Sequence, residues 1–163
     1  MSANLLSDST VAFIEREVAI DISSRSAALR PSACRAFACQ VAPDRQRLTL
    51  FVRRQEAQPV LNDVLQQDVV AAVFCLPATE TAMQIKGRQV QLSAATPDQI
   101  AYVQGYCHRF VEGVTRIGHN RDFAKAYMAI EPDSMVALSF VPEQVFEQTP
   151  GPQAGRPVMG TLP

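Results

Sequence analysis

The chain has 163 residues, of which 47% are hydrophobic, and its formal net charge at pH 7 is −1. This length and composition predict one globular domain with a sizeable core and exclude a largely disordered chain. The near-zero charge gives no general attraction to nucleic acid or to an acidic membrane. No apolar run approaches the ~20 residues of a membrane span, and the N-terminus lacks a secretory-signal pattern. We therefore expect a cytoplasmic protein.

The cysteines and histidines give no sign of a metal site. The four cysteines follow no C-x-x-C spacing, and neither His108 nor His119 has a Cys or His at zinc-ligand spacing. We therefore expect reduced and mostly buried thiols. The cysteines are Cys34, Cys39, Cys75 and Cys107.

The first part of the chain begins with a short helix and continues with strands. Apolar residues of Ser7–Glu17 recur at roughly helical spacing, and Val18–Ser24 alternates like a half-buried strand. Two further strand-like runs, Pro31–Ala42 and Arg47–Val52, flank the turn-forming sequence PDRQ. These two runs predict a hairpin.

The middle of the chain predicts a helix between buried strands. Pro59 suits the first helical position, where its missing N–H costs nothing, and the apolar residues of 60–65 form one face. Val69–Leu76 is a continuous apolar run, typical of a strand covered on both sides. Ala82–Leu92 alternates along its length, but its faces switch after Gly87, which predicts a bulge there.

The last part of the chain predicts two helices, a strand and an irregular tail. Thr96 followed by Pro97 is a helix start, and a short helix follows around Asp122–Ala129. Met135–Phe146 is expected to be the last strand, and the Pro- and Gly-rich tail 147–163 is expected to be irregular.

Five or six strands joined mostly by short turns, with helices inserted between them, predict an antiparallel barrel of the α+β class. We expect a single domain over 1–163, with the barrel over about 18–146 and the C-terminal tail over 147–163.

This order of elements resembles the FMN-binding split barrel of the pyridoxamine 5′-phosphate oxidase-like superfamily, over roughly Leu6–Leu92. Three stretches carry the resemblance: RPSA at Arg30–Ala33, LFVRRQEAQPVLNDVLQQDVVAAVFCL at Leu50–Leu76, and AMQIKG at Ala82–Gly87. The tail sequence FEQTPGPQAGRPV is also similar to tails in this superfamily. The resemblance implies an antiparallel split barrel, a homodimer, and FMN in a groove between the two barrels.

The sequence departs from the oxidase pattern at most of its polar positions. Cys34 stands where the pattern has an Arg, and Arg35 follows one place later. Gln58 and Pro59 replace an Arg-Lys pair, and Ala82 stands where a Gln commonly reaches the flavin ring. A divergent member of the superfamily is therefore expected, without pyridoxamine phosphate oxidase activity itself.

The remaining candidates for a phosphate lie before the helix at Pro59. Arg53, Arg54 and Gln55 stand beside the positive end of that helix, and charge-assisted bonds from Arg are strong. The alternative is a solvent-exposed turn in which one arginine pairs with Glu56 or Asp63.

Three further cofactor-binding candidates lie on predicted strands. Gln84 and Lys86 alternate, so both can face the same groove beside the flavin ring, and Arg35 is another possible donor. The spacing of residues identifies no nucleophile–base pair and no catalytic residue, so in a redox reaction the flavin would carry the chemistry.

Two functions follow from these observations. The first is an FMN-binding oxidoreductase that is a cytoplasmic homodimer and acts on a small molecule. The second is a non-catalytic split-barrel binding protein, with no flavin or with another planar anionic ligand such as haem. No nucleic-acid or membrane partner is expected.

Overall fold

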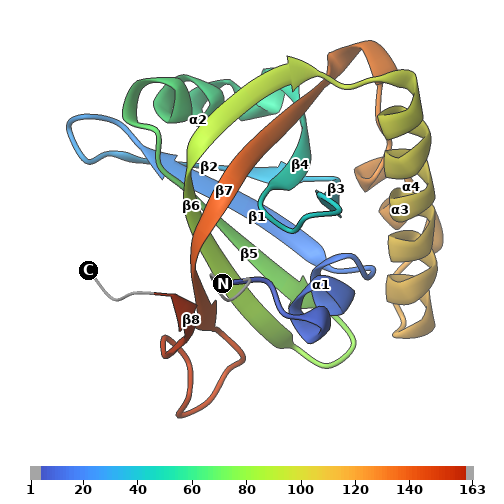
Figure 1. Cartoon of the computed structure of the whole chain (residues 1–163). Helices are drawn as coiled ribbons and strands as arrows, with labels where there is room; N and C mark the ends of the chain where they lie inside the picture. Colours follow the sequence, from blue (N-terminus) through green and yellow to red (C-terminus); the bar gives the residue numbers. More distant parts are fainter. Residues whose placement is uncertain (1–4, 161–163) are drawn as a thin grey trace.

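The computed structural model describes residues 5–160, without the side chains of 159 and 160. Within this range the chain forms one eight-stranded sheet, four α-helices and one 3-10 turn (Figure 1). The elements are α1 (Asp8–Ile14), β1 (Ala19–Arg25), β2 (Pro31–Ala36), β3 (Ala38–Val41), β4 (Leu48–Arg53), α2 (Arg54–Gln67), β5 (Val70–Leu76), β6 (Thr81–Ala94), α3 (Pro97–Arg116), α4 (Arg121–Tyr127), η1 (Pro132–Ser134), β7 (Met135–Glu147) and β8 (Pro157–Gly160).

The sheet is antiparallel throughout and curls into a barrel. Its strand order is β2-β1-β5-β6-β7-β4-β3, and β8 adds to β7. The two outer strands, β2 and β3, are consecutive in sequence and are separated only by Phe37. The N–H of Phe37 donates to the carbonyl oxygen of Phe51 on β4 at 2.8 Å, which continues the pairing of β3 with β4. The chain therefore passes from one edge of the sheet to the other at Phe37. The predicted antiparallel α+β split barrel is confirmed.

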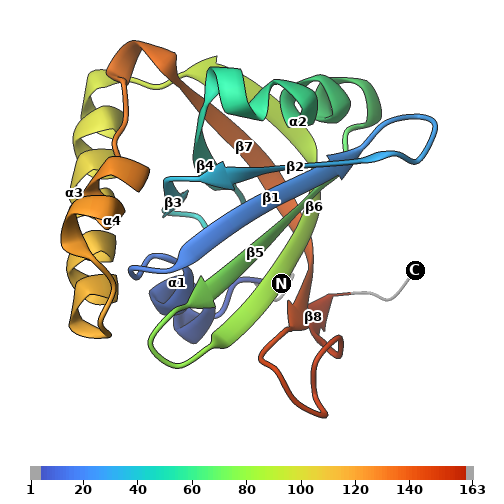
Figure 2. The same cartoon turned by 180° about the vertical axis from the view of Figure 1, so that it is seen from behind.

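The helices cover the barrel at two places. α2 packs against β1, β2 and β4, and the α3–α4 pair stands along one side of the barrel (Figures 1 and 2). Tyr102 and Tyr106 of α3 donate their hydroxyls to the carbonyl oxygens of Cys39 and Val18, at 2.6 Å and 3.1 Å. No helix in the described part of the chain is long and apolar enough to span a membrane.

Alternation along the strands separates the barrel interior from an outer face. Ile20, Ile22, Phe74 and Ile85 point inward and are buried. Their neighbours in sequence point outward, and on β1, β5 and β6 many of these are short. We call this surface the outer face; it includes Ala19, Asp21, Ser23, Ala71, Val73, Cys75, Ala82, Gln84 and Lys86.

The bulge predicted near Gly87 is confirmed. The pairing of β6 with β7 shifts between Lys86 and Gly87, and shifts again between Arg88 and Gln91. A Cβ atom at Gly87 would lie 2.2 Å from the carbonyl oxygen of Val141. Only glycine lets the two strands approach so closely at this place.

The helix expected to begin at Pro59 instead begins at Arg54. Arg53, in extended conformation, is the N-cap residue, and Pro59 lies inside the helix. Ala57 is buried one turn before Val60 and Leu61, so the apolar face starts earlier than the sequence pattern indicated. Because Pro59 has no backbone N–H, the helix lacks one hydrogen bond at this position.

Two further expectations about strands are wrong. The expected single strand Pro31–Ala42 is broken at Phe37 into β2 and β3, because the chain there passes from one edge of the sheet to the other. The tail is not wholly irregular, since Pro157–Gly160 forms β8 against β7. Its proline occupies the first position of an edge strand, where a missing N–H is tolerated. Residues 161–163 of the tail lie outside the described residues.

Candidate functional site

Two neighbouring hollows lie on the outer face. The first, which we call the basic hollow, has a volume of about 350 Å³. It is lined by Ser23, Ser24, Arg25, Val69, Val70, Ala71, Lys86, Gly87, Arg88, Glu143 and Gln144. The second, which we call the Gln84 hollow, has a volume of about 550 Å³. It is lined by Val73, Cys75, Glu80, Ala82, Gln84, Gln148 and Pro150.

The strand register places both hollows on the same side of the sheet. Lys86 pairs with Ala71 in one row, and Gln84 pairs with Val73 in the next row. Same-face rows are two residues apart, or about 6.6 Å along a strand. The two hollows therefore lie in adjacent rows, and together we call them the strip along β5 and β6.

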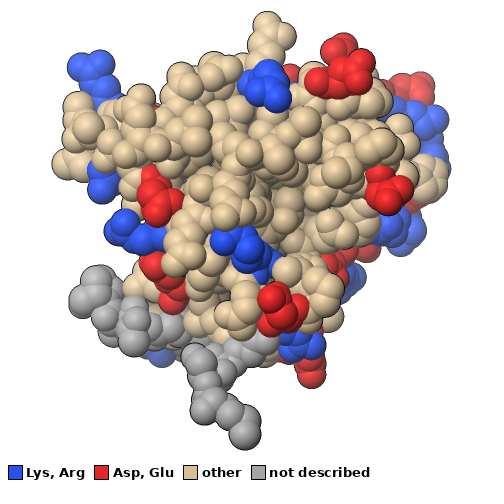
Figure 3. Space-filling view, turned by 45° about the horizontal axis from the view of Figure 1, so that its top comes forward, with Lys and Arg blue, Asp and Glu red and all other residues tan. Residues whose placement is uncertain are grey.

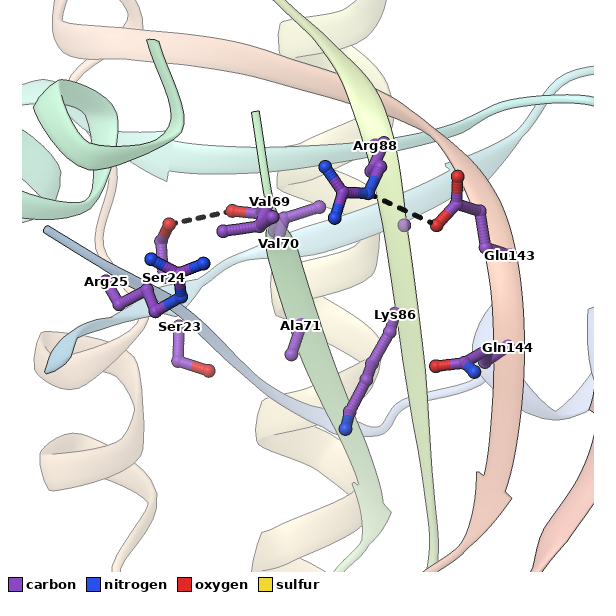
Figure 4. A pocket seen from close by; sticks show the side chains of 11 residues that line it. Ser23, Ser24, Arg25, Val69, Val70, Ala71, Lys86, Arg88, Glu143 and Gln144 are labelled. Atoms are coloured by element: carbon purple, nitrogen blue, oxygen red, sulfur yellow. Dashed lines mark hydrogen bonds and ion pairs between the residues drawn. The ribbon is translucent and has the colours of Figure 1, made fainter. Parts of the chain in front are cut away.

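The basic hollow brings cations from two strands around a short side chain. Arg25 extends from the end of β1, and Lys86 and Arg88 extend from β6, around Ala71 of β5 (Figure 4). Arg88 lies 3.6 Å from Glu143 of β7, and both side chains are about half exposed. The Lys86 ammonium lies 4.8 Å from the centroid of the Phe146 ring, an arrangement that favours the cation.

The Gln84 hollow has a floor of small side chains and a wall made by the tail. Val73, Cys75 and Ala82 form the floor beside Gln84. The tail is fixed at this place by Thr149, whose Oγ1 accepts a hydrogen bond from the backbone N–H of Ala82 at 3.0 Å. The backbone of the tail therefore borders the outer face of its own barrel.

Arg53 makes contacts within the chain through all of its guanidinium nitrogens. Nε donates to the carbonyl oxygen of Ala129 at 3.0 Å, Nη2 donates to the carbonyl oxygens of Tyr127 and Ala129, and Nη1 pairs with Glu56 at 2.8 Å. The guanidinium also stacks 4.1 Å from the centroid of the Phe37 ring. The pairing with Glu56 that the alternative hypothesis included is present for Arg53, but the stretch begins helix α2 and is not a solvent-exposed turn.

Arg53, Arg54 and Gln55 do not form one cluster. Arg53 and Gln55 line a hollow beside the chain that follows α4, together with the carboxylates of Glu56 and Glu131. Arg54 lies in a different hollow, between α2 and the start of β7. The side chains diverge because α2 begins at Arg54, and successive residues of a helix point in different directions.

The Arg35 side chain packs against aromatic residues of α3 and α4. Its guanidinium carbon lies 5.4 Å from the ring centroid of Phe110 and 5.6 Å from that of Tyr127, and its side chain is 15% exposed. Nη1 lies 3.7 Å from the Asp21 carboxylate, and Nε is buried without a hydrogen-bond partner. Through Asp21 and Val73, Arg35 lies in the same row of the outer face as Gln84, but its guanidinium is engaged by these contacts. The structure therefore places Gln84, Lys86 and Arg35 on one face and places Arg53, Arg54 and Gln55 elsewhere.

The thiols near these sites are held protonated. Burial, with smaller effects from Glu80 and Asp21, raises the pKa of Cys75 above its ordinary value. Burial also raises the pKa of Cys34 to about 12. A thiolate is the reactive form of cysteine, so neither side chain has the character of a nucleophile at neutral pH.

Charge on the face of the molecule drawn in Figure 3 is mixed rather than gathered in one large field. Figure 3 shows acidic and basic residues interspersed at the margins of the α2 side, with a mostly uncharged centre. Nucleic-acid surfaces are instead strongly basic over a broad patch.

Sequence reasoning missed two members of the basic hollow. Arg88 follows Lys86 at the same-face spacing of a strand, so alternation alone could have suggested it. Arg25 reaches this place only because β5 lies between β1 and β6 in the sheet, and the sequence order gives no sign of that arrangement.

The comparisons with known proteins agree on the fold. No family model matches the sequence, and no curated protein matches it in sequence. Among solved structures, an F420 reductase matches with a TM-score of 0.54 at 10% identity, covering 82% of this chain and 93% of that chain. A candidate pyridoxamine 5′-phosphate oxidase from Lactobacillus delbrueckii matches with a TM-score of 0.54 at 13% identity, covering 90% and 97%. HupZ of Group A Streptococcus matches with a TM-score of 0.53 at 10% identity, covering 91% and 98%. The chain therefore has the split-barrel fold of the pyridoxamine 5′-phosphate oxidase-like proteins.

Proposed function

We propose that the protein is a divergent flavoprotein that binds FMN on its outer face and acts as an oxidoreductase on a small molecule. The observation that carries the proposal is the strip on β5 and β6, where the Gln84 hollow adjoins the basic hollow. The fold supports the same proposal, since the comparable structures include an F420 reductase and a candidate pyridoxamine 5′-phosphate oxidase.

The residues of the Gln84 hollow suit a planar ring. Val73, Cys75 and Ala82 offer a floor with few protruding atoms, and the Gln84 amide can donate to or accept from the polar edge of a flavin. A bound flavin supplies the electron transfer, and the protein supplies orientation and exclusion of water. Arg53, Arg54, Gln55 and Arg35 have no part in this proposal, because they lie elsewhere or are already engaged.

A second copy of the chain is proposed to cover the outer face. Ala19, Ala71, Val73 and Cys75 are only partly buried in one chain, although their side chains are small and mostly apolar. A surface of such small side chains can be covered by the same surface of a second copy related by two-fold symmetry. The flavin would then lie between the two barrels.

Titration of FMN against purified protein, followed by flavin fluorescence, tests the proposal. Cys75→Tyr fills the Gln84 hollow and should weaken FMN binding at least tenfold. Ser93→Tyr, an equally large change at an exposed position in another hollow, should leave it unchanged. Equal effects of both substitutions, or no FMN binding to the parent protein, would contradict the proposal. Binding of haemin alone would instead favour the non-catalytic binding protein.

A further inference from the structure

We propose that the basic hollow is a site for the phosphate group of a phosphomonoester, and that the phosphate it takes is that of the flavin. The second half of this proposal rests on the proposed function, whereas the first half depends only on the residues of the hollow. These residues are not among those that the family resemblance implies for a phosphate.

The charge of the hollow matches that of a phosphomonoester. Arg25, Lys86 and Arg88 contribute three positive charges, and Glu143 contributes one negative charge, so the net charge is 3 − 1 = +2. A phosphomonoester carries about −1.5 to −2 at pH 7. The matched charges favour this dianion over a carboxylate, which carries one negative charge.

Two of the three cations have no acidic partner in the described part of the chain. Within residues 5–160, neither Arg25 nor Lys86 takes part in an ion pair. Arg25 makes a long hydrogen bond of 3.4 Å to the carbonyl oxygen of Ser26, and Lys86 lies over the Phe146 ring. Their charged N–H groups can therefore bind an oxyanion without first breaking a salt bridge.

The hollow has room for a phosphate because its centre is made of short side chains. Ser23, Ala71 and Lys86 form one row across β1, β5 and β6, and only Lys86 is long (Figure 4). The Ser23 hydroxyl adds a neutral donor from the same row. Long side chains at Ser23 or Ala71 would fill the hollow.

The position of the hollow suits the phosphate end of an elongated cofactor. Lys86 is the next same-face residue after Gln84, so the cationic end of the strip begins about 6.6 Å from the proposed ring site. The start of α2 offers no comparable site. There Arg53 is engaged by Glu56 and by backbone carbonyls, and Glu131 adds another negative charge.

Comparison of FMN with riboflavin tests the inference, because the two share the ring and the ribityl chain and differ only in the phosphate. We expect the parent protein to bind FMN at least tenfold more tightly than riboflavin, which corresponds to a difference of about 1.4 kcal/mol in binding free energy. In the double variant Arg25→Gln, Lys86→Gln, the ratio of the affinity for FMN to the affinity for riboflavin should fall close to one. Arg54→Gln, a matched loss of charge in another hollow, should leave the ratio unchanged.

A second variant separates loss of charge from loss of space. Ala71→Leu keeps every charge but fills the centre of the hollow. It should therefore also lower the ratio of the affinity for FMN to the affinity for riboflavin. A circular-dichroism melting curve for each variant establishes that the barrel remains folded. Equal affinity of the parent protein for the two flavins, or an unchanged ratio in both variants, would overturn the inference while leaving the flavin function in place.

Inorganic phosphate and glycerol phosphate extend the test to a protein that binds no flavin. Failure of both flavins to bind contradicts the proposed function. If glycerol phosphate then binds to the parent protein, and the double variant loses that binding, the phosphate site itself is supported. Absence of binding by both flavins, inorganic phosphate and glycerol phosphate would overturn the whole inference.

Discussion

Nε of Arg53 donates to the carbonyl oxygen of Ala129 at 3.0 Å, joining the start of α2 to the chain that follows α4. Nη2 reaches the carbonyl oxygen of Tyr127 at 2.9 Å, so the guanidinium holds the end of α4 at two points. The Phe37 ring lies beneath it, at the break between β2 and β3. One side chain thus connects three segments that are distant in the sequence.

Substitution of Arg53 by Ala is therefore expected to destabilise the protein. Each hydrogen bond from a charged donor contributes about 1.5–3 kcal/mol, so we expect a loss of about 2–3 kcal/mol in the free energy of unfolding. Urea denaturation measures this loss. Arg54→Ala, an exposed neighbour on the same helix, should change stability by less than about 0.5 kcal/mol. Similar values for the two variants would contradict the role given to Arg53.

Substitution of Gly87 by Ala is expected to destabilise the barrel by about 1–3 kcal/mol, the usual cost of overpacking a tight site. The added Cβ would lie 2.2 Å from the Val141 carbonyl oxygen and 2.5 Å from the Phe140 ring, so one strand must move. Thermal unfolding measures the effect.

Gly105→Ala provides the matched control for Gly87. Gly105 lies within α3, and an added Cβ would meet only the Arg109 side chain, at 3.6 Å. Alanine has the higher helix propensity, so this variant should be more stable than the parent by about 0.4–1 kcal/mol. Equal shifts in the same direction at both glycines would mean that the close approach at Gly87 does not exist in solution.

Stability is expected to fall at alkaline pH. Burial raises the pKa of Cys34 to about 12 and that of Cys107 to about 11, and burial raises the pKa of Cys39 well above 9.0. The unfolded chain loses these protons near pH 8.5, whereas the folded chain retains them. The stabilising contribution is therefore complete below about pH 8.5 and declines as the pH rises towards 11.

Urea denaturation at a series of pH values from 7 to 10 follows this decline. Cys34→Ala should make the decline shallower, because one fewer proton differs between the two states. A free energy of unfolding that stayed constant or rose over this range would contradict the burial of the thiols.

The proposed dimer is expected to depend on the outer face. Val73→Arg places a charge at the centre of that face and should convert a dimer into a monomer of 17.8 kDa. Leu65→Arg replaces an exposed apolar residue on α2 and should leave the dimer intact. Sedimentation at several protein concentrations distinguishes these cases. Dissociation by the α2 variant, and not by the outer-face variant, would place the interface elsewhere.

Local sequence patterns predicted much of the barrel, and they failed where distant segments meet. The strand at Val69–Leu76, the bulge at Gly87 and the helix start at Thr96 depend on neighbouring residues, and each is confirmed. The expected cover on both sides of that strand is not seen in one chain, since its alternate residues are only partly buried. The break at Phe37 arises because β2 pairs with β1 whereas β3 pairs with β4, and no local pattern contains that information.

The same distinction applies to the candidate site. The common orientation of Gln84 and Lys86 follows from alternation on one strand. Arg53 donates a hydrogen bond to the carbonyl oxygen of Ala129, which is distant in the sequence. Arg25 lies near Lys86 because β5 lies between β1 and β6 in the sheet. The sequence shows the charges of Arg53 and Arg54 but not the residues that they contact in the fold. The two arginines therefore resembled an anion site.

The flavin content of freshly purified protein tests the central claim most directly. The protein is denatured, the released cofactor is separated by chromatography, and FMN and total protein are quantified. Protein from a host supplied with riboflavin should release FMN, approaching one FMN per chain, and the Cys75→Tyr variant should release much less. Absence of flavin from the parent protein, together with no binding when FMN is added back, would contradict the account.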